Sequence, residues 1–161
     1  MKKVSVWLRR CLMLAAGVVV AFFMILFFYP ISKSHTRAKA RQCMCLNNIR
    51  DIMAGIDMFT QAHDGRLPEA LTWADNLQLY VKNRQAFKCL DDRTDQAVSY
   101  AMVQRYSGAK LDDIPSRSET ILIYEVENGQ PAYRHLGGMN VAYADGHREW
   151  LEQLPPGTLD E

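Results

Sequence analysis

The residues best suited to chemistry gather near the C-terminal end, in the stretch RHLGGMNVAYADGHREWL, residues 134–151. This stretch contains His135, Asp145 and His147, and Glu125 comes shortly before it. Imidazole and carboxylate groups together form a ligand set for zinc or a similar divalent ion. The four side chains are therefore candidate metal ligands. A membrane-tethered, metal-dependent enzyme is one interpretation of the chain.

A purely structural interpretation explains the same residues. Asp145 and Gly146 are typical of a tight β-hairpin turn, Gly137 and Gly138 of a bend that leads into the hairpin, and His135 of a backbone contact at that bend. Extended chain rises about 3.3 Å per residue, so His135 and Asp145 are expected about 30 Å apart, at opposite ends of the hairpin. We favour this interpretation, which predicts no catalytic residue and no cofactor, and a divalent metal stays an open alternative.

Charge and motif content exclude several classes of function. From Asp51 onward the chain carries 10 Lys and Arg against 18 Asp and Glu, a net charge of −8, whereas everything before it is basic and contains no acid. An acidic domain lacks the basic surface that phosphate backbones require, so nucleic acid is not expected as a partner. The sequence also contains no phosphate-binding loop, no HExxH and no dinucleotide fingerprint.

Four cysteines, at positions 11, 43, 45 and 89, have no CxxC spacing of the zinc-ribbon kind. In an oxidising compartment Cys89 has two candidate partners, Cys45 and Cys43, and the pair Cys45–Cys89 is our candidate disulfide. The alternative is a set of buried free thiols, which behave as small apolar side chains.

The elements that position these residues begin with an N-terminal anchor. The segment from Cys11 to Ile31 contains no charged residue and is long enough as a helix to cross a bilayer. Its length favours an uncleaved anchor over a cleaved signal peptide. Basic residues precede the segment, which favours a cytoplasmic N-terminus and an extracytoplasmic head, although basic residues also follow it closely. We assign residues 1–31 to a cytoplasmic stub and single membrane span.

Residues 32–64 read as a basic stalk that leads into an amphipathic helix. Its apolar residues recur at the helical period. They are Cys45, Leu46, Ile49, Ile52, Met53, Ile56 and Phe59. Asp64-Gly65 offers a left-handed cap, and Pro68 follows soon after, so the helix is expected to end there.

Residues 65–161 are predicted to form an α/β head. The segment 68–81 is expected to form a short helix with Leu71, Leu77 and either Tyr80 or Val81 inward. Strands are expected over 97–103 and 119–126, and a hairpin over Met139–Ala144 and His147–Leu151 with a type I′ turn. Trp73, Trp150 and the tyrosines are expected in the core. The predicted class is α+β, with the long helix packed on a small antiparallel sheet.

Five short sequence motifs, in this order, resemble those of the pilin-like family named after its H-X9-DG domain, also called prepilin-type processing-associated proteins. They are ARQCMCLNNIRDIMAGIDMFTQAHDGRLP, WADNLQLYV, FKCLDD, IPSRSETILIYEV, and His135 followed after nine residues by Asp145-Gly146. The likeness covers most of the chain from about Ala38 to Leu151. It implies a pseudopilin-like fold, a single-pass protein of the inner (cytoplasmic) membrane with its head in the periplasm, and partners among pilin-like or type II secretion proteins.

The N-terminus departs from the family pattern. Prepilins carry a glycine, then an aromatic residue or methionine, then Thr-Leu-Ile-Glu, which prepilin peptidase recognises. Here Gly17 is followed by three valines, and the apolar span contains no glutamate. The expected role is therefore structural, in a type II secretion or type IV pilus-like system, without ordinary processing. The alternatives are the tethered enzyme and an extracytoplasmic binding or scaffold module on the same fold.

Overall fold

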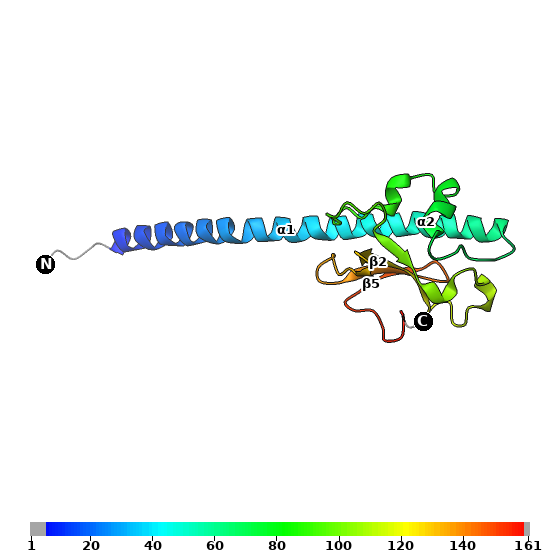
Figure 1. Cartoon of the computed structure of the whole chain (residues 1–161). Coiled ribbons are helices and arrows are strands. Elements are labelled where there is room, and N and C mark those ends of the chain that lie inside the picture. The colour runs from blue at the N-terminus through cyan, green and yellow to red at the C-terminus, as the bar shows by residue number, and fades with distance from the viewer. Residues whose placement is uncertain (1–5, 160–161) are drawn as a thin grey trace. The chain divides into compact units, whose positions relative to one another are not determined.

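The computed structural model of the chain describes residues 6–159, except for the side chains of residues 6 and 29–33. One helix, α1, runs from Val6 to Ala62 (Figure 1). The chain divides into two compact units, Met1–Ala38 and Lys39–Glu161. The first unit contains the 22-residue segment Trp7–Phe28, which is long and apolar enough to cross a membrane, a property that signal sequences share. Lys2 and Lys3, the first basic residues of the predicted stub, lie outside the described residues.

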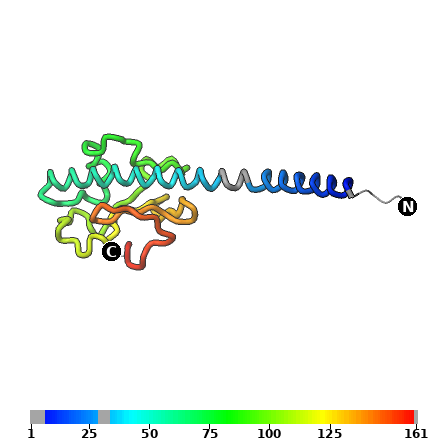
Figure 2. Tube along the Cα trace, turned by 180° about the vertical axis from the view of Figure 1, so that it is seen from behind, coloured from blue at the N-terminus to red at the C-terminus, as the bar shows by residue number. Residues whose placement is uncertain are grey.

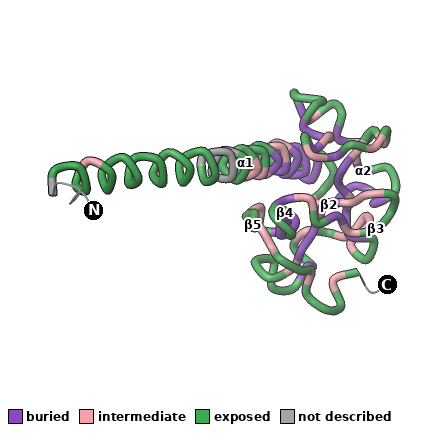
Figure 3. The backbone as a smooth tube through the Cα atoms, turned by 90° about the vertical axis from the view of Figure 1, so that its left-hand side faces the viewer, coloured by how far each residue is buried: buried purple, intermediate pink, exposed green. Residues whose placement is uncertain are grey.

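The second unit is built on the last part of α1, the cyan part of the tube in Figure 2. The predicted apolar stripe is confirmed: its residues from Cys45 to Phe59 are buried, except Leu46, which is half-buried. Figure 3 shows this change along α1, from exposed backbone to a run of buried turns beside the sheet. The helix ends where the sequence predicts, because Asp64 and Gly65 both take positive φ, 54° and 77°.

The predicted second helix is only partly present. Residues Trp73–Asn76 form α2, and Leu77–Leu79 continue it as a short 3₁₀ turn, η1. Leu77 and Val81 are buried as expected, whereas the prediction that Leu71 points inward is wrong, since it is 88% exposed. Trp73 is buried in its place. The helix begins five residues later than Pro68, so the inward face is set by Trp73 rather than by Leu71.

An antiparallel sheet packs against the opposite side of α1 from α2 (Figure 1). Its strands are β1 (Tyr100–Met102), β2 (Ile121–Glu127), β3 (Gln130–Pro131), β4 (Met139–Tyr143) and β5 (Arg148–Leu151). The order is β1-β2-β4-β5, with β3 paired to β2. The predicted α+β class is confirmed. The strand predicted over 119–126 is present as β2, the strand predicted over 97–103 is present only as the three residues of β1, and β3 was not predicted. Three further 3₁₀ turns are η2 (Arg84–Phe87), η3 (Gln104–Tyr106) and η4 (Leu111–Asp113).

The predicted hairpin is confirmed, but its turn differs from the prediction. Met139 pairs with Leu151, and Ala142 with Arg148. The backbone N–H of Gly146 donates to the Tyr143 carbonyl at 2.9 Å, and only Gly146 in this loop has positive φ, 90°. A three-residue loop with a left-handed third residue replaces the type I′ turn. Asp145 avoids positive φ because one glycine is sufficient in the longer loop.

Successive residues of β4 point to opposite faces of the sheet, and both faces of the strand are buried. Ala142 joins the main core between the sheet and α1. Met139, Val141 and Tyr143 join a second, smaller core on the far face of the sheet, together with Val103 and Ile121. Strand β4 therefore separates the two cores and contributes side chains to both.

Candidate functional site

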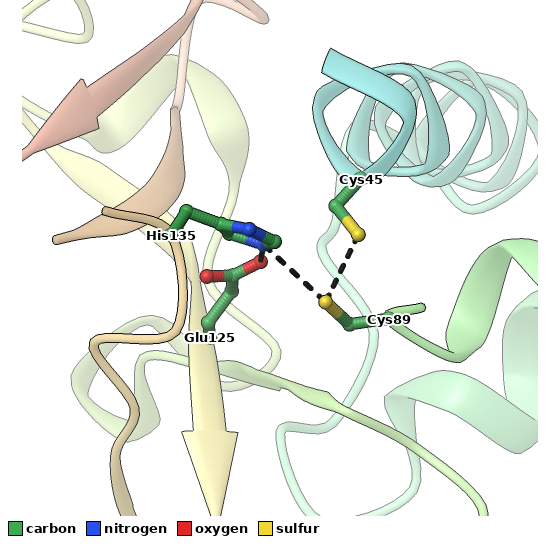
Figure 4. A group of neighbouring side chains, drawn as sticks. All are labelled: Cys45, Cys89, Glu125 and His135. Carbon is green, nitrogen blue, oxygen red and sulfur yellow. Dashed lines mark hydrogen bonds and ion pairs between the residues drawn. The ribbon is translucent and has the colours of Figure 1, made fainter. Parts of the chain in front are cut away.

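Four buried side chains meet between α1 and the sheet (Figure 4). They are Cys45, Cys89, Glu125 and His135, and one ligand atom from each lies within 4.8 Å of all the others. The two sulfur atoms are 2.9 Å apart, Cys89 Sγ lies 3.3 Å from His135 Nε2, and Nε2 lies 2.9 Å from Glu125 Oε1. We call these four residues the Cys-Cys-Glu-His cluster.

Each member of the cluster comes from a different segment. Cys45 is the first residue of the buried stripe of α1. Glu125 lies on the same face of β2 as Ile123, because alternate strand residues share a face, so its carboxylate points toward α1. Cys89 follows η2, and its backbone N–H donates to the Ser99 hydroxyl at 2.9 Å. The cluster therefore forms only when helix, loop and sheet are all in place.

His135 is positioned by a tight turn that ends at Gly138. Its N–H and carbonyl pair with those of Gly138 at 2.8 and 3.0 Å, and Leu136 and Gly137 between them have φ of 56° and 86°. Two central residues with positive φ are the pattern of a type I′ turn. Trp150 Nε1 donates to the His135 carbonyl at 2.7 Å. This backbone frame directs the ring into the core.

The two nitrogens of the His135 ring face different partners. Nε2 faces the cluster, while Nδ1 lies 3.3 Å from Asp91 Oδ2. Asp91 is in turn held by Arg41 Nε, 2.5 Å from its other oxygen. The ring is therefore oriented from outside by a carboxylate that is itself fixed to α1.

Glu125 is also held on both oxygens. The backbone N–H of Asn140 donates to Oε2 at 3.2 Å, and the Asn140 side-chain amide lies 3.5 Å from Oε1. The same amide donates to the Gln42 carbonyl on α1 at 3.3 Å. Asn140 thereby joins β4, β2 and α1 around the cluster.

A second polar centre supports the loop that carries Cys89. Asp92 accepts hydrogen bonds from Ser99 at 2.5 Å and from the Thr94 hydroxyl at 2.7 Å, and Lys88 Nζ lies 3.1 Å from it. Because the same Ser99 hydroxyl accepts from the Cys89 backbone, the Asp92 network fixes the position of Cys89.

Burial and mutual contacts shift the ionisation of the cluster. Hydrogen bonding to Cys89 lowers the pKa of the Cys45 thiol to about 5, and the same contact, with burial, raises the pKa of Cys89. Burial raises the pKa of Glu125. Burial opposes the charged form of His135, but hydrogen bonds to Cys45 and Glu125 outweigh it and raise its pKa to about 10. At neutral pH the ring is therefore a buried cation among potential anions.

The structure separates the metal candidates that the sequence suggested. His135 and Glu125 come together, whereas Asp145 and His147 lie at the β4–β5 turn. There His147 Nδ1 is 2.6 Å from Asp145 Oδ1, and hydrogen bonds from the His147 backbone and ring lower the pKa of Asp145. Strand β4 runs between the two places. The four-residue ligand group found among the described side chains contains neither Asp145 nor His147.

The sequence left two alternatives for Cys45 and Cys89, a disulfide or buried free thiols. In the structure Cys45 and Cys89 are free, buried and in contact, while Cys43 is exposed. The sequence does contain a signal for their grouping with Glu125. Cys45 continues an apolar stripe, and Glu125 occupies a core-facing position in an apolar strand, so both have ligating side chains pointing into one core.

The comparisons with known proteins add no relative. No protein-family model, no curated protein and no solved structure matches this chain.

Proposed function

We propose that this chain is a membrane-anchored, pseudopilin-like structural protein that assembles with other pilin-like or secretion-system proteins. One observation carries the proposal: a single helix, α1, begins with an exposed apolar segment of membrane-spanning length and ends as the core helix of an antiparallel α+β head. That order of parts, together with the five sequence motifs, is what the pilin-like resemblance implies. The membrane is the inner membrane and the head is extracytoplasmic.

The apolar segment supplies an assembly surface. Ala15, Ala16, Gly17 and Ala21 are small and exposed. In lipid, helices associate through close packing rather than through hydrophobic exclusion, so small residues favour contact. The basic residues after the segment suit anionic headgroups at the membrane surface. The head then acts as a folded module held at the membrane, not as a catalyst.

The test is recovery of partners from membranes. The full-length chain, tagged at its C-terminus, is crosslinked in its native cells, extracted and analysed by mass spectrometry. Support requires partners that themselves carry an N-terminal apolar helix and a pilin-like head, or that belong to a secretion or pilus platform. Recovery with no such protein contradicts the proposal.

Two variants make the test specific to the helix surface. Ala16→Leu and Gly17→Leu enlarge the small-residue patch and are expected to reduce partner recovery, while Val20→Leu leaves an already large apolar position large and serves as the control. Equal recovery from all three would place the contact outside this patch.

A further inference from the structure

We propose that the Cys-Cys-Glu-His cluster is a structural zinc site that joins α1, the loop after η2, β2 and the turn before β4. The proposal does not depend on the assembly role, because it rests only on residues of the head. Its first support is convergence: four ligating atoms from four segments lie within 4.8 Å of one another, and all four residues are buried. Figure 4 shows the four side chains pointing toward one space between the helix and the strands.

The orientation of His135 is the second support. Metal-binding histidines usually present one nitrogen to the ion and give the other N–H to a carboxylate or carbonyl, which fixes the ring and its tautomer. Here Nε2 faces the two cysteines and Glu125, while Nδ1 lies 3.3 Å from Asp91. Arg41 holds that carboxylate in place. A histidine with only a packing role has no need for a fixed carboxylate on its outer nitrogen.

The two carboxylate oxygens of Glu125 are also oriented in different directions, one toward the cluster and one away from it. Its Oε2 accepts the backbone N–H of Asn140, and its Oε1 points toward Nε2. A monodentate zinc ligand keeps one oxygen for the ion and uses the other for hydrogen bonds. Both ligands with two candidate atoms therefore turn one atom inward. The other atom faces a polar group outside the cluster, a hydrogen-bonding N–H for Glu125 and a carboxylate for His135.

Without a metal ion, a single proton on His135 Nε2 has to serve two acceptors. Nε2 carries at most one proton, yet it lies within hydrogen-bond distance of both Cys89 Sγ and Glu125 Oε1. The two sulfurs are also in direct contact. A divalent ion at the centre would neutralise two thiolates, which are the forms that bind metal.

The ligand types select zinc. Two thiolates, an imidazole and a carboxylate suit a tetrahedral zinc ion, whereas calcium and magnesium require shells of oxygen. Four protein ligands in a buried position leave no open coordination site, which is the character of a structural site rather than a catalytic one. The expected role is to lock the sheet onto α1.

A disulfide between Cys45 and Cys89 is the competing outcome. The present separation of the sulfurs, 2.9 Å, lies between the disulfide value of about 2.05 Å and the value of about 3.8 Å for two sulfurs on one tetrahedral zinc. The sulfurs must move in either case, so their distance does not decide. The zinc site uses all four inward-facing groups, whereas a disulfide uses only the two sulfurs and leaves Glu125 and His135 facing each other. We therefore assign the cluster to zinc.

The experiment measures metal on the full-length chain purified from membranes in detergent under mildly reducing conditions. Elemental analysis is expected to find about one zinc per chain. Replacement by cobalt(II) is expected to produce sulfur-to-cobalt charge-transfer absorption. The variants Cys45→Ser and His135→Gln are expected to lose most of the zinc, and Cys45→Ser also to weaken the charge-transfer band.

Matched controls separate this site from adventitious binding. Cys43→Ser removes an exposed thiol two positions from Cys45, and His147→Gln removes an exposed histidine, so both should retain zinc. If the cluster variants fail to fold, the wild-type chain still decides: a strong chelator should lower its thermal midpoint, and added zinc should restore it.

Three results would overturn the assignment. One is a wild-type chain with intact thiols that binds neither zinc nor cobalt. Another is a predominant Cys45–Cys89 linked peptide after alkylation without reduction. The third is zinc content that persists in Cys45→Ser and His135→Gln but disappears in His147→Gln.

Discussion

His135 Nε2 and Glu125 Oε1 lie 2.9 Å apart, and both side chains are fully buried, so the turn before β4 is joined to β2 by a charged pair within the core. Burial of such a pair is costly unless further polar contacts complete it. Here the Asn140 backbone N–H donates to Glu125, and the Asp91 carboxylate lies 3.3 Å from the other nitrogen of the His135 ring. The pair therefore belongs to a built polar centre inside an otherwise apolar interface.

Removing one partner of this pair should strongly lower the stability of the folded head. In Glu125→Ala the His135 ring loses the carboxylate that lies nearest to it, and the expected loss of stability is about 3 kcal/mol. Urea unfolding of the detergent-solubilised chain, followed by tryptophan fluorescence, measures it. Glu119→Ala, at an exposed position just before β2, is the control and should change stability by less than about 0.5 kcal/mol. Equal losses of stability in the two variants would show that the contact between His135 and Glu125 does not stabilise the head.

Acid sensitivity should be concentrated at Asp92. Burial alone would raise the pKa of this carboxyl, but hydrogen bonds from Ser99, Thr94 and Gln96 hold it well below its ordinary value. A group with a lowered folded pKa stabilises the protein above its unfolded pKa of about 4, and this contribution is lost as pH falls through that value and below it.

The variant Asp92→Asn tests this directly. It should lose about 2 kcal/mol at pH 7, because hydrogen bonds to a charged acceptor are lost, and should show a smaller further loss between pH 5 and about pH 3 than the wild type. Thermal midpoints measured across this pH range give the comparison. Asp95→Asn, at an exposed position, should follow the wild-type profile, and an unchanged acid profile in Asp92→Asn would refute the assignment.

Substitution of Gly138 and of Gly146 should lower the stability of the chain for two different reasons. A Cβ on Gly138 would collide with the Leu151 backbone carbonyl and the Trp150 ring, so Gly138→Ala should destabilise the chain by about 2 kcal/mol through overpacking. Gly146 has open space around it but a φ of 90°, so Gly146→Val should lose about 1 kcal/mol or more through backbone strain. Urea unfolding measures both losses, and a neutral Gly138→Ala would contradict the contact with Trp150.

The apolar segment should remain part of the mature chain. The expectation of an uncleaved anchor predicts that protein extracted from membranes still contains the apolar segment from Cys11 to Ile31. Intact-mass analysis and N-terminal sequencing provide the measurement. A mature N-terminus near Lys39 or Arg41 would instead identify the segment as a cleaved signal.

Local pattern was enough to predict the helix stripe, the hairpin and the fold class. The buried run from Cys45 to Phe59 follows directly from the helical period. The position of the hairpin turn, though not its type, follows from the Asp145-Gly146 pair. The prediction for Leu71 was wrong because a helix only four residues long is too short to show the helical period of apolar residues. Local pattern works where one face of a regular element decides burial.

The cluster could not be predicted in the same way. Cys45 and Cys89 are 44 positions apart, and their meeting depends on how the loop after η2 packs against α1. No local spacing such as CxxC reports that contact. Glu125 and His135 were both candidates, but the sequence placed His135 with the turn at Asp145 rather than with the two thiols, because the hairpin motif was the stronger local signal.

Strand β4 has a consequence for the dynamics of the head. All five of its residues are buried, and it pairs with β2 on one side and β5 on the other. Its amide hydrogens should therefore exchange with deuterated solvent only when the whole head opens, while those of the two-residue edge strand β3 exchange through local fluctuations. The slowest-exchanging amides thus report the global stability of the domain, and they lie in the segment between His135 and Asp145.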